Sequence, residues 1–114
     1  MTDKELTAAA ARAAGYNIEP RENGTEFAIE REGRWFPFAP IDDDGDALRL
    51  AVSLGLNIDV YRKEPTNSTA SVEVRAFVTR RSLVLVPARD NGESLQMATR
   101  RAIVMAAAKI GDLK

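Results

Sequence analysis

The chain contains neither cysteine nor histidine. The absence of cysteine excludes disulfide bonds, thiolate nucleophiles and cysteine zinc sites. The absence of histidine excludes imidazole bases, catalytic triads built on histidine, and the ligand that most transition-metal sites use. Glycine-rich phosphate-binding loops are missing as well. We therefore expect neither a metal nor another cofactor, and a protein that is not an enzyme.

Long apolar runs are also missing. No run approaches the roughly 20 residues that cross a bilayer, and the first five residues lack the basic and apolar regions of a signal peptide. We expect a cytoplasmic protein that does not enter a membrane. The chain has 114 residues, of which 45% are hydrophobic and 29% are charged. These values predict one globular domain that covers residues 1–114.

Charge is nearly balanced overall but unevenly distributed along the chain. Residues 1–64 contain 8 basic and 13 acidic residues, whereas residues 65–114 contain 8 basic and 4 acidic residues. This division could produce one acidic and one basic face of the molecule. Folding could equally bring the two halves together into a mixed surface. The sequence leaves both interpretations open.

Two helices are predicted in the first half of the chain. Thr2 and Glu5 form a capping box in front of an alanine-rich run. Gly15 is suited to end the resulting helix, which we expect over about residues 3–14. A second, short helix follows a group of aspartates and ends at Gly55.

A hairpin is predicted between these helices. Residues 17–24 have the composition of a loop, and apolar and polar residues then alternate over 25–30, as in a half-buried strand. Residues 32–33, Glu-Gly, are suited to a tight turn into a second strand. Pro37 either ends that second strand early or confines it to a sheet edge.

The second half predicts three strands and a final helix. Alternation indicates strands over residues 56–61 and 72–78, and residues 83–86 form a third. The third strand is apolar on both faces, which is typical of a central position in a sheet. The final helix is expected to begin at residues 91–93 and to end at Gly111.

These elements predict an α+β fold with the order α-β-β-α-β-β-β-α. Short connections favour antiparallel pairing, so we expect a mainly antiparallel sheet packed by helices, an α/β sandwich. The final helix should bury a stripe made of Leu95, Ala98, Ala102, Ala106 and Ile110. The residues expected to be mostly buried are Leu48, Val72, Val74, Leu83, Leu85, Leu95 and Ile103.

Three stretches of this sequence resemble a known family. Residues 35–38, WFPF, and residues 42–52, DDDGDALRLAV, are similar to the W-x-P and D-D-G-D-A-L-R-L-A-V segments of the phage and prophage "ABA sandwich" family of small proteins. Residues 98–111, ATRRAIVMAAAKIG, resemble its C-terminal helix, and the opening helix also fits. Phe36 stands where that family has asparagine. The resemblance implies a phage or prophage origin and an α/β sandwich, and it carries no catalytic residues over to this chain.

The aspartates before the second helix allow two interpretations. Closely spaced carboxylates suit a hard cation such as Ca²⁺ or Mg²⁺. The calcium-loop pattern fails, however, because placing Gly45 at its invariant glycine would put Pro40 at the first ligand. Paired carboxylates of a hydrolase would have to face each other across a cleft. We favour an acidic helix cap without a metal, formed by Asp42, Asp43, Asp44 and Asp46.

The aromatic segment at residues 35–38 could be an exposed platform for a partner protein or for bases. On a strand, Trp35 and Pro37 face one way, and Phe36 and Phe38 face the other. Because large aromatic side chains dominate core packing, we expect both Trp35 and Phe38 to be largely buried.

Basic residues of the second half could form a binding surface. The element order after residue 46 is similar to that of the double-stranded RNA-binding domain, but Arg100 and Arg101 lie too late in the final helix for its phosphate contact. They could simply form the polar side of an amphipathic helix. A hairpin and its exit combine arginines with an aromatic residue, as binding hot spots do. The partner-binding candidates are therefore Arg75, Phe77, Arg80, Arg81 and Arg89; the alternative is plain surface charge.

We favour a small phage- or prophage-encoded interaction protein without enzymatic activity. It would bind a host macromolecule and inhibit or modulate it, for example an antiviral defence system such as CRISPR. One alternative is a nucleic-acid-binding module whose C-terminal part is like a double-stranded RNA-binding domain. Another is a structural or assembly accessory protein of the phage. The expected partner is a host or phage protein, and both nucleic acid and a second copy of the chain stay open.

Overall fold

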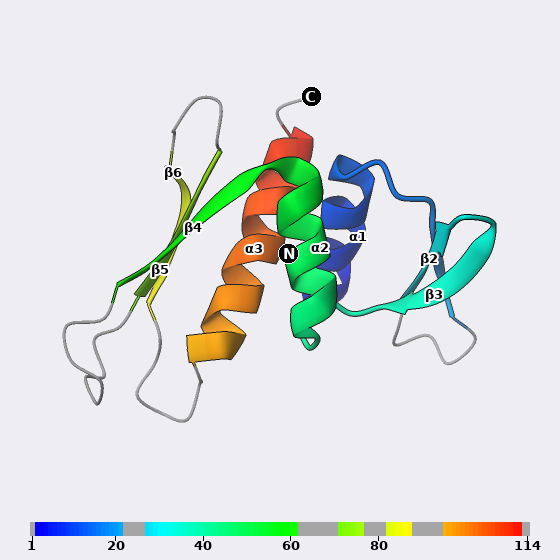
Figure 1. The fold of residues 1–114 in the computed structure, drawn as a ribbon, viewed down its shortest axis with the longest axis horizontal. Coiled ribbons are helices and arrows are strands. Elements are labelled where there is room, and N and C mark those ends of the chain that lie inside the picture. Colours follow the sequence, from blue (N-terminus) through cyan, green and yellow to red (C-terminus); the bar gives the residue numbers. More distant parts are fainter. Residues whose placement is uncertain (1, 22–26, 62–70, 77–81, 88–94, 113–114) are drawn as a thin grey trace.

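The computed structural model describes residues 2–21, 27–61, 71–76, 82–87 and 95–112. In this part of the chain, three helices form a central layer, with one three-stranded sheet beyond α1 and the other beside α3 (Figure 1). The elements are α1 (Asp3–Ala13), β1 (Ile18–Pro20), β2 (Phe27–Arg31), β3 (Arg34–Phe38), α2 (Asp44–Leu54), β4 (Leu56–Tyr61), β5 (Ser71–Ala76), β6 (Ser82–Pro87) and α3 (Leu95–Asp112).

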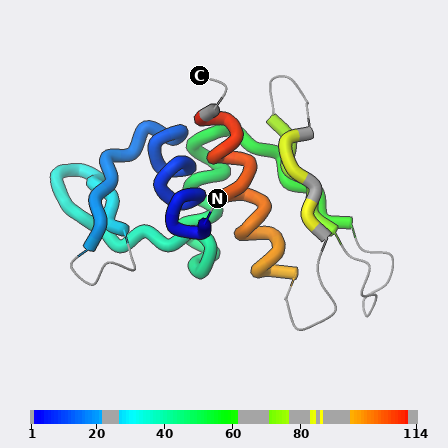
Figure 2. The backbone as a smooth tube through the Cα atoms, turned by 180° about the vertical axis from the view of Figure 1, so that it is seen from behind, coloured from blue at the N-terminus to red at the C-terminus, as the bar shows by residue number. Residues whose placement is uncertain are grey.

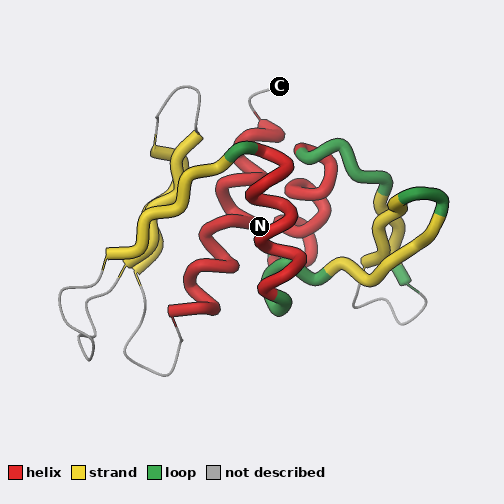
Figure 3. Tube along the Cα trace, viewed as in Figure 1, coloured by secondary structure: helices red, strands yellow, loops and turns green. Residues whose placement is uncertain are grey.

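The predicted α+β class is confirmed, and every strand pair is antiparallel. The observed order is α-β-β-β-α-β-β-β-α, with one strand more than expected. β1 lies inside the predicted loop 17–24, where Ile18 pairs with Ile29 of β2. The strands are also divided between two sheets, β1-β2-β3 and β4-β5-β6, on opposite sides of the helices (Figures 2 and 3).

The helix cap, the hairpin turn and the helix end that the sequence predicts are all present in the structure. The Glu5 backbone N–H donates to the Thr2 hydroxyl at 3.1 Å, as a capping box requires. Glu32 and Gly33 both have positive φ, 54° and 78°. Positive φ at both residues is typical of the tight turns that connect twisted antiparallel strands, here β2 and β3. Gly55 ends α2 in the left-handed conformation with φ 63°, so that β4 begins directly after the helix.

Helices α1 and α3 pack through small side chains. Ala10 of α1 and Ala107 of α3 are fully buried in the same cluster. Near the end of α3, a Cβ added to Gly111 would lie 3.4 Å from the Cβ of Ala13. Gly111 lies inside α3, which continues to Asp112, so the predicted end of the helix was one residue short. Alanine and glycine allow the two helix backbones to approach closely.

Two apolar clusters hold the layers together. The first joins the three helices to the β1-β2-β3 sheet and contains Leu50, Phe38 and Ile29. The second lies between α3 and the β4-β5-β6 sheet. Burial is confirmed for Val72, Val74, Leu83 and Ile103, and for the alanines of the α3 stripe, Ala98, Ala102 and Ala106. Leu95 and Ile110 are partly buried. The side chain of Leu85 lies outside the described part of the structure.

The prediction that residues 83–86 form a central strand was wrong. β5 is the central strand of this sheet, and β6 forms an edge. A register shift between Val74 and Arg75 of β5 interrupts the alternation of β6, so that the neighbours Leu83 and Val84 both contact the second cluster. The irregularity explains why two successive residues of β6, Leu83 and Val84, are both apolar.

Candidate functional site

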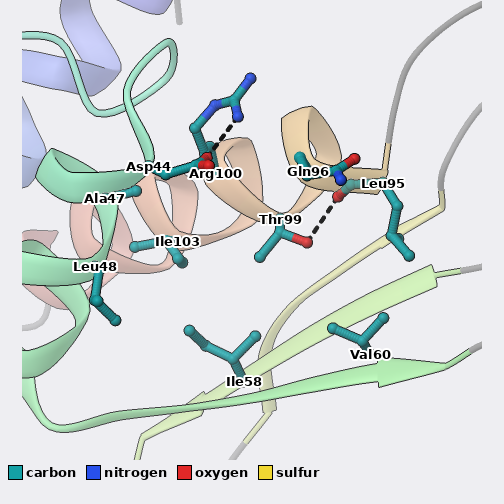
Figure 4. Close-up of a pocket in the computed structure, with 10 residues that line it drawn as sticks. All are labelled: Asp44, Ala47, Leu48, Ile58, Val60, Leu95, Gln96, Thr99, Arg100 and Ile103. Atoms are coloured by element: carbon teal, nitrogen blue, oxygen red, sulfur yellow. Dashed lines mark hydrogen bonds and ion pairs between the residues drawn. The ribbon is translucent and has the colours of Figure 1, made fainter.

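An apolar groove lies between α2, β4 and α3 (Figure 4). Helix α2 and strand β4 diverge from each other (Figure 1) after the helix ends at Gly55. Side chains of both elements and of the first turns of α3 line the groove (Figure 4). The groove has a volume of about 450 Å³. It is lined by Asp44, Ala47, Leu48, Ile58, Val60, Leu95, Gln96, Thr99, Arg100 and Ile103.

The groove exposes apolar side chains that a packed core would cover. Leu48 is 60% exposed and Val60 is 49% exposed, and both lie on its walls. The predicted burial of Leu48 was therefore wrong. α2 buries the face that carries Ala47, Leu50 and Ala51 against the first cluster, which turns Leu48 toward β4. α3 packs mainly against α1, and on the side of the β4-β5-β6 sheet it contacts β5 and β6 more than β4. No described element fills the space between β4 and α2.

One ion pair marks the polar side of the groove. The Arg100 Nη1 donates to the Asp44 carboxylate at 2.6 Å, and the Arg100 Nε donates to the Ile41 carbonyl at 2.8 Å. The Arg100 side chain is only 16% exposed, whereas the Asp44 side chain is 76% exposed. Arg100 is thus held in place by two acceptors, and the Asp44 carboxylate remains open to a bound group.

The aspartates at the start of α2 act as the predicted cap. The Asp43 side chain accepts a hydrogen bond from the Asp46 N–H at 2.8 Å. Buried Asp46 accepts from the Ala39 N–H at 2.9 Å and from Arg49 at 2.7 Å. Within the described ranges, no group of three or more acidic side chains is placed to hold a metal ion. These bonds confirm capping by Asp43, whereas Asp46 binds the Ala39 N–H and Arg49, and Asp44 pairs with Arg100.

Arg75 is the one candidate binding residue within the described part of the chain. It lies on the outer face of the β4-β5-β6 sheet, as predicted, but its guanidinium is engaged by its own neighbours. Arg75 contacts Glu73 at 2.6 Å, Asp59 at 3.6 Å and the Tyr61 hydroxyl at 3.2 Å. This outer-face cluster contains two carboxylates for one guanidinium, so it does not present a basic patch. The other candidates, Phe77, Arg80, Arg81 and Arg89, lie outside the described residues.

The outer-face cluster changes the titration of Tyr61. The hydrogen bond that its hydroxyl donates to Glu73 raises the pKa of Tyr61, with further contributions from desolvation and from the Glu73 charge. The folded state therefore favours the neutral phenol of Tyr61. This preference contributes to the stability of the folded chain below the ordinary pKa of tyrosine, and the contribution is lost as pH rises through the folded pKa.

We expect the phenol of Tyr61 to ionise above its ordinary pKa. A near-ultraviolet absorbance titration of a Tyr16→Phe variant reports Tyr61 alone, because the chain has two tyrosines. Adding Glu73→Gln should lower the midpoint, since it removes the carboxylate charge that opposes the phenolate. A midpoint that does not respond to Glu73→Gln would contradict the effect of the Glu73 carboxylate on the Tyr61 phenol.

Basic residues of the second half of the chain form ion pairs with acidic residues of the first half. Arg100 pairs with Asp44, and Arg101 pairs with Asp3 at 2.8 Å. The hydrogen bond from Arg101 lowers the pKa of Asp3. Among the described residues, these contacts support the mixed surface rather than a basic face. The RNA-binding interpretation of Arg100 and Arg101 therefore finds no support in their contacts.

The aromatic segment of β3 is divided between core and solvent. Phe38 is buried, as predicted, and its ring meets Tyr16 edge to face. Trp35 is 45% exposed, so the prediction that it is buried was wrong. It lies on the same face of the strand as Pro37, whereas Phe36 is half-buried beneath the Arg31 guanidinium. The helices cover only the face that carries Phe36 and Phe38, which leaves Trp35 on the outer side.

No motif in the sequence indicates that this groove is a binding site. A hint is the position of Leu48 and Val52, which lie one turn apart on a face of α2 beside its buried stripe. A helix that is apolar on two faces needs a second surface to cover it.

Comparisons with known proteins found no match among protein-family models, curated proteins or solved structures. In the described part of the chain, no helix is both long and apolar enough to cross a membrane.

Proposed function

We propose that the chain is a non-enzymatic interaction domain that binds a segment of a partner protein in the groove between α2, β4 and α3. The exposed apolar walls of the groove carry this proposal. A partner side chain that covered Leu48 and Val60 would remove apolar surface from water, which is the main favourable contribution to protein association. The absence of histidine and cysteine and the apolar lining support binding rather than catalysis.

The negative charge at one end of the groove favours a partner segment that carries a basic residue there. Asp44 lines the groove with an exposed carboxylate, and the exposed Asp42 and Asp43 directly precede it. Arg100 is held by Asp44 and by a backbone carbonyl. A segment with apolar side chains and a lysine or arginine at the α2 end complements both features.

The wider role follows from the resemblance to the phage and prophage family. In that setting the partner would be a host or phage protein, and binding would inhibit or modulate it; an antiviral defence system is one such target. Assembly of the phage particle is the alternative setting for the same binding surface. The proposal rests on the groove for the act of binding and on the resemblance for the biological setting.

Two matched variants on α2 test the groove. Leu48 and Val52 are both exposed and one turn apart, but Leu48 lines the groove and Val52 does not. With a partner that has been captured from host cells, identified and purified, Leu48→Asp should weaken binding by at least about 30-fold, as loss of an interface hot spot does. Val52→Asp introduces the same charge and should leave the affinity within a few-fold.

Equal effects of the two variants, or no effect of Leu48→Asp, would contradict the groove as the binding site. The salt dependence of the affinity provides a second criterion. A protein segment should show a shallow dependence, whereas a nucleic acid would lose affinity steeply and linearly on logarithmic axes. A steep dependence with Leu48→Asp unchanged would favour a nucleic-acid-binding module instead.

A further inference from the structure

The described part of the structure has four sheet edges, and they differ in how they are protected. Three edge strands contain a proline: Pro20 in β1, Pro37 in β3 and Pro87 in β6. Proline lacks the N–H that a neighbouring strand would bond, and it is a common device against unwanted pairing. The fourth edge strand, β4, contains no proline, lysine or arginine.

The two edges of the β4-β5-β6 sheet show this contrast most clearly. β6 adjoins the register shift opposite Val74 and Arg75, and its Leu83 carbonyl already accepts a hydrogen bond from the Lys109 ammonium at 3.0 Å. β4 pairs with β5 in unbroken register from Leu56 to Tyr61. No described segment pairs with its other side. β4 is thus a regular strand with an open row of main-chain donors and acceptors.

The sequence of β4 is complementary to itself in one antiparallel register. Opposite residues in such a pair share a face, so a two-fold axis at Ile58 places Leu56 opposite Val60 of the second copy on the apolar face. On the outer face, the same axis places Asn57 opposite Asp59 of the second copy. Moving the axis to Asp59 would instead place two carboxylates opposite each other, which is destabilising.

We propose that β4 pairs antiparallel with β4 of a second copy of this chain, around a two-fold axis at Ile58. The two three-stranded sheets then form one continuous sheet across the dimer. Val60, which is half-exposed in the single chain, gains a neighbour on the apolar face. The chain carries a net charge of only −1, so overall charge repulsion does not oppose association. Val60 also lines the groove, so the proposed dimer contact adjoins the groove at this residue.

Sedimentation of the purified chain over a range of concentrations tests the dimer. The wild-type chain should shift from monomer to twice the monomer mass as concentration rises. Asn57→Asp places a carboxylate opposite Asp59 of the second copy at two symmetric positions. Each such pair changes stability modestly, so the dimer should dissociate about 2- to 30-fold more readily.

The fold of the single chain should tolerate Asn57→Asp, because position 57 pairs with Arg75 of β5. A thermal melt of the monomer at low concentration checks this. The double variant Asn57→Asp with Asp59→Asn exchanges the two groups, so it should restore wild-type association. This rescue separates a specific register from a general effect of charge.

A chain that stays monomeric at every concentration would overturn the proposal, and so would a dimer that Asn57→Asp leaves unchanged. Asp59→Asn alone provides the last distinction. It should have little effect if the axis lies at Ile58, but it should strengthen a dimer centred on Asp59 and thereby overturn the proposed register. A β4 edge that accepts a strand of a different protein, while the chain remains monomeric, would also contradict pairing with a second copy.

Discussion

Replacement of Leu50 by alanine is expected to lower the free energy of unfolding by about 2–5 kcal/mol. Leu50 is fully buried in α2, in the cluster that joins the three helices to the β1-β2-β3 sheet. Alanine would lose the apolar contact and leave a cavity among side chains that cannot fully close it. Urea denaturation followed by far-ultraviolet circular dichroism measures the change.

Leu48→Ala is the matched control for this prediction. It removes the same atoms from the same helix two positions earlier, but from a side chain that faces the groove. Its effect on the free energy of unfolding should stay within about 0.5 kcal/mol, as for other exposed positions. Similar losses in the two variants would contradict the orientation of α2.

Replacement of Ala10 by leucine is expected to destabilise the fold by about 1–3 kcal/mol, because it overpacks a filled site. Ala10 is fully buried where α1 packs along α3, and small residues line both sides of that contact. A larger side chain would push the helices apart or force itself and its neighbours out of their preferred rotamers. The same denaturation measurement applies.

Ala8 lies in the same helix and is only partly buried, so Ala8→Leu serves as the control. Leucine and alanine have similar helix propensities, and the control should therefore change stability much less than Ala10→Leu. If Ala10→Leu were as stable as the wild type, the close contact between α1 and α3 would be wrong.

The caps, turns and burial periods could be predicted because each depends on a few neighbouring residues. Thr2 with Glu5 and the αL residue Gly55 determine where helices start or end. Alternation in β5 correctly placed Val72 and Val74 on the packed face. These features follow from local backbone chemistry and from the side-chain period of each element.

Features that depend on the arrangement of elements could not be predicted in the same way. Leu48 and Leu50 are equally apolar, and only the placement of α2 between the core and the open space beside β4 separates them. Trp35 is exposed because helices cover just one face of its sheet. β1 has only three residues, and this length is too short for a periodicity to be recognised in a sequence.

The groove between α2, β4 and α3 is proposed as the surface that binds a partner. The most direct measurement is a titration of the isotope-labelled chain with the purified partner, followed by nuclear magnetic resonance. We expect the amide signals of Leu48, Val60 and Thr99 to change, while the indole N–H of the single tryptophan, Trp35, stays constant. Changes centred on Trp35 or on the outer face around Arg75, with the groove signals constant, would contradict it.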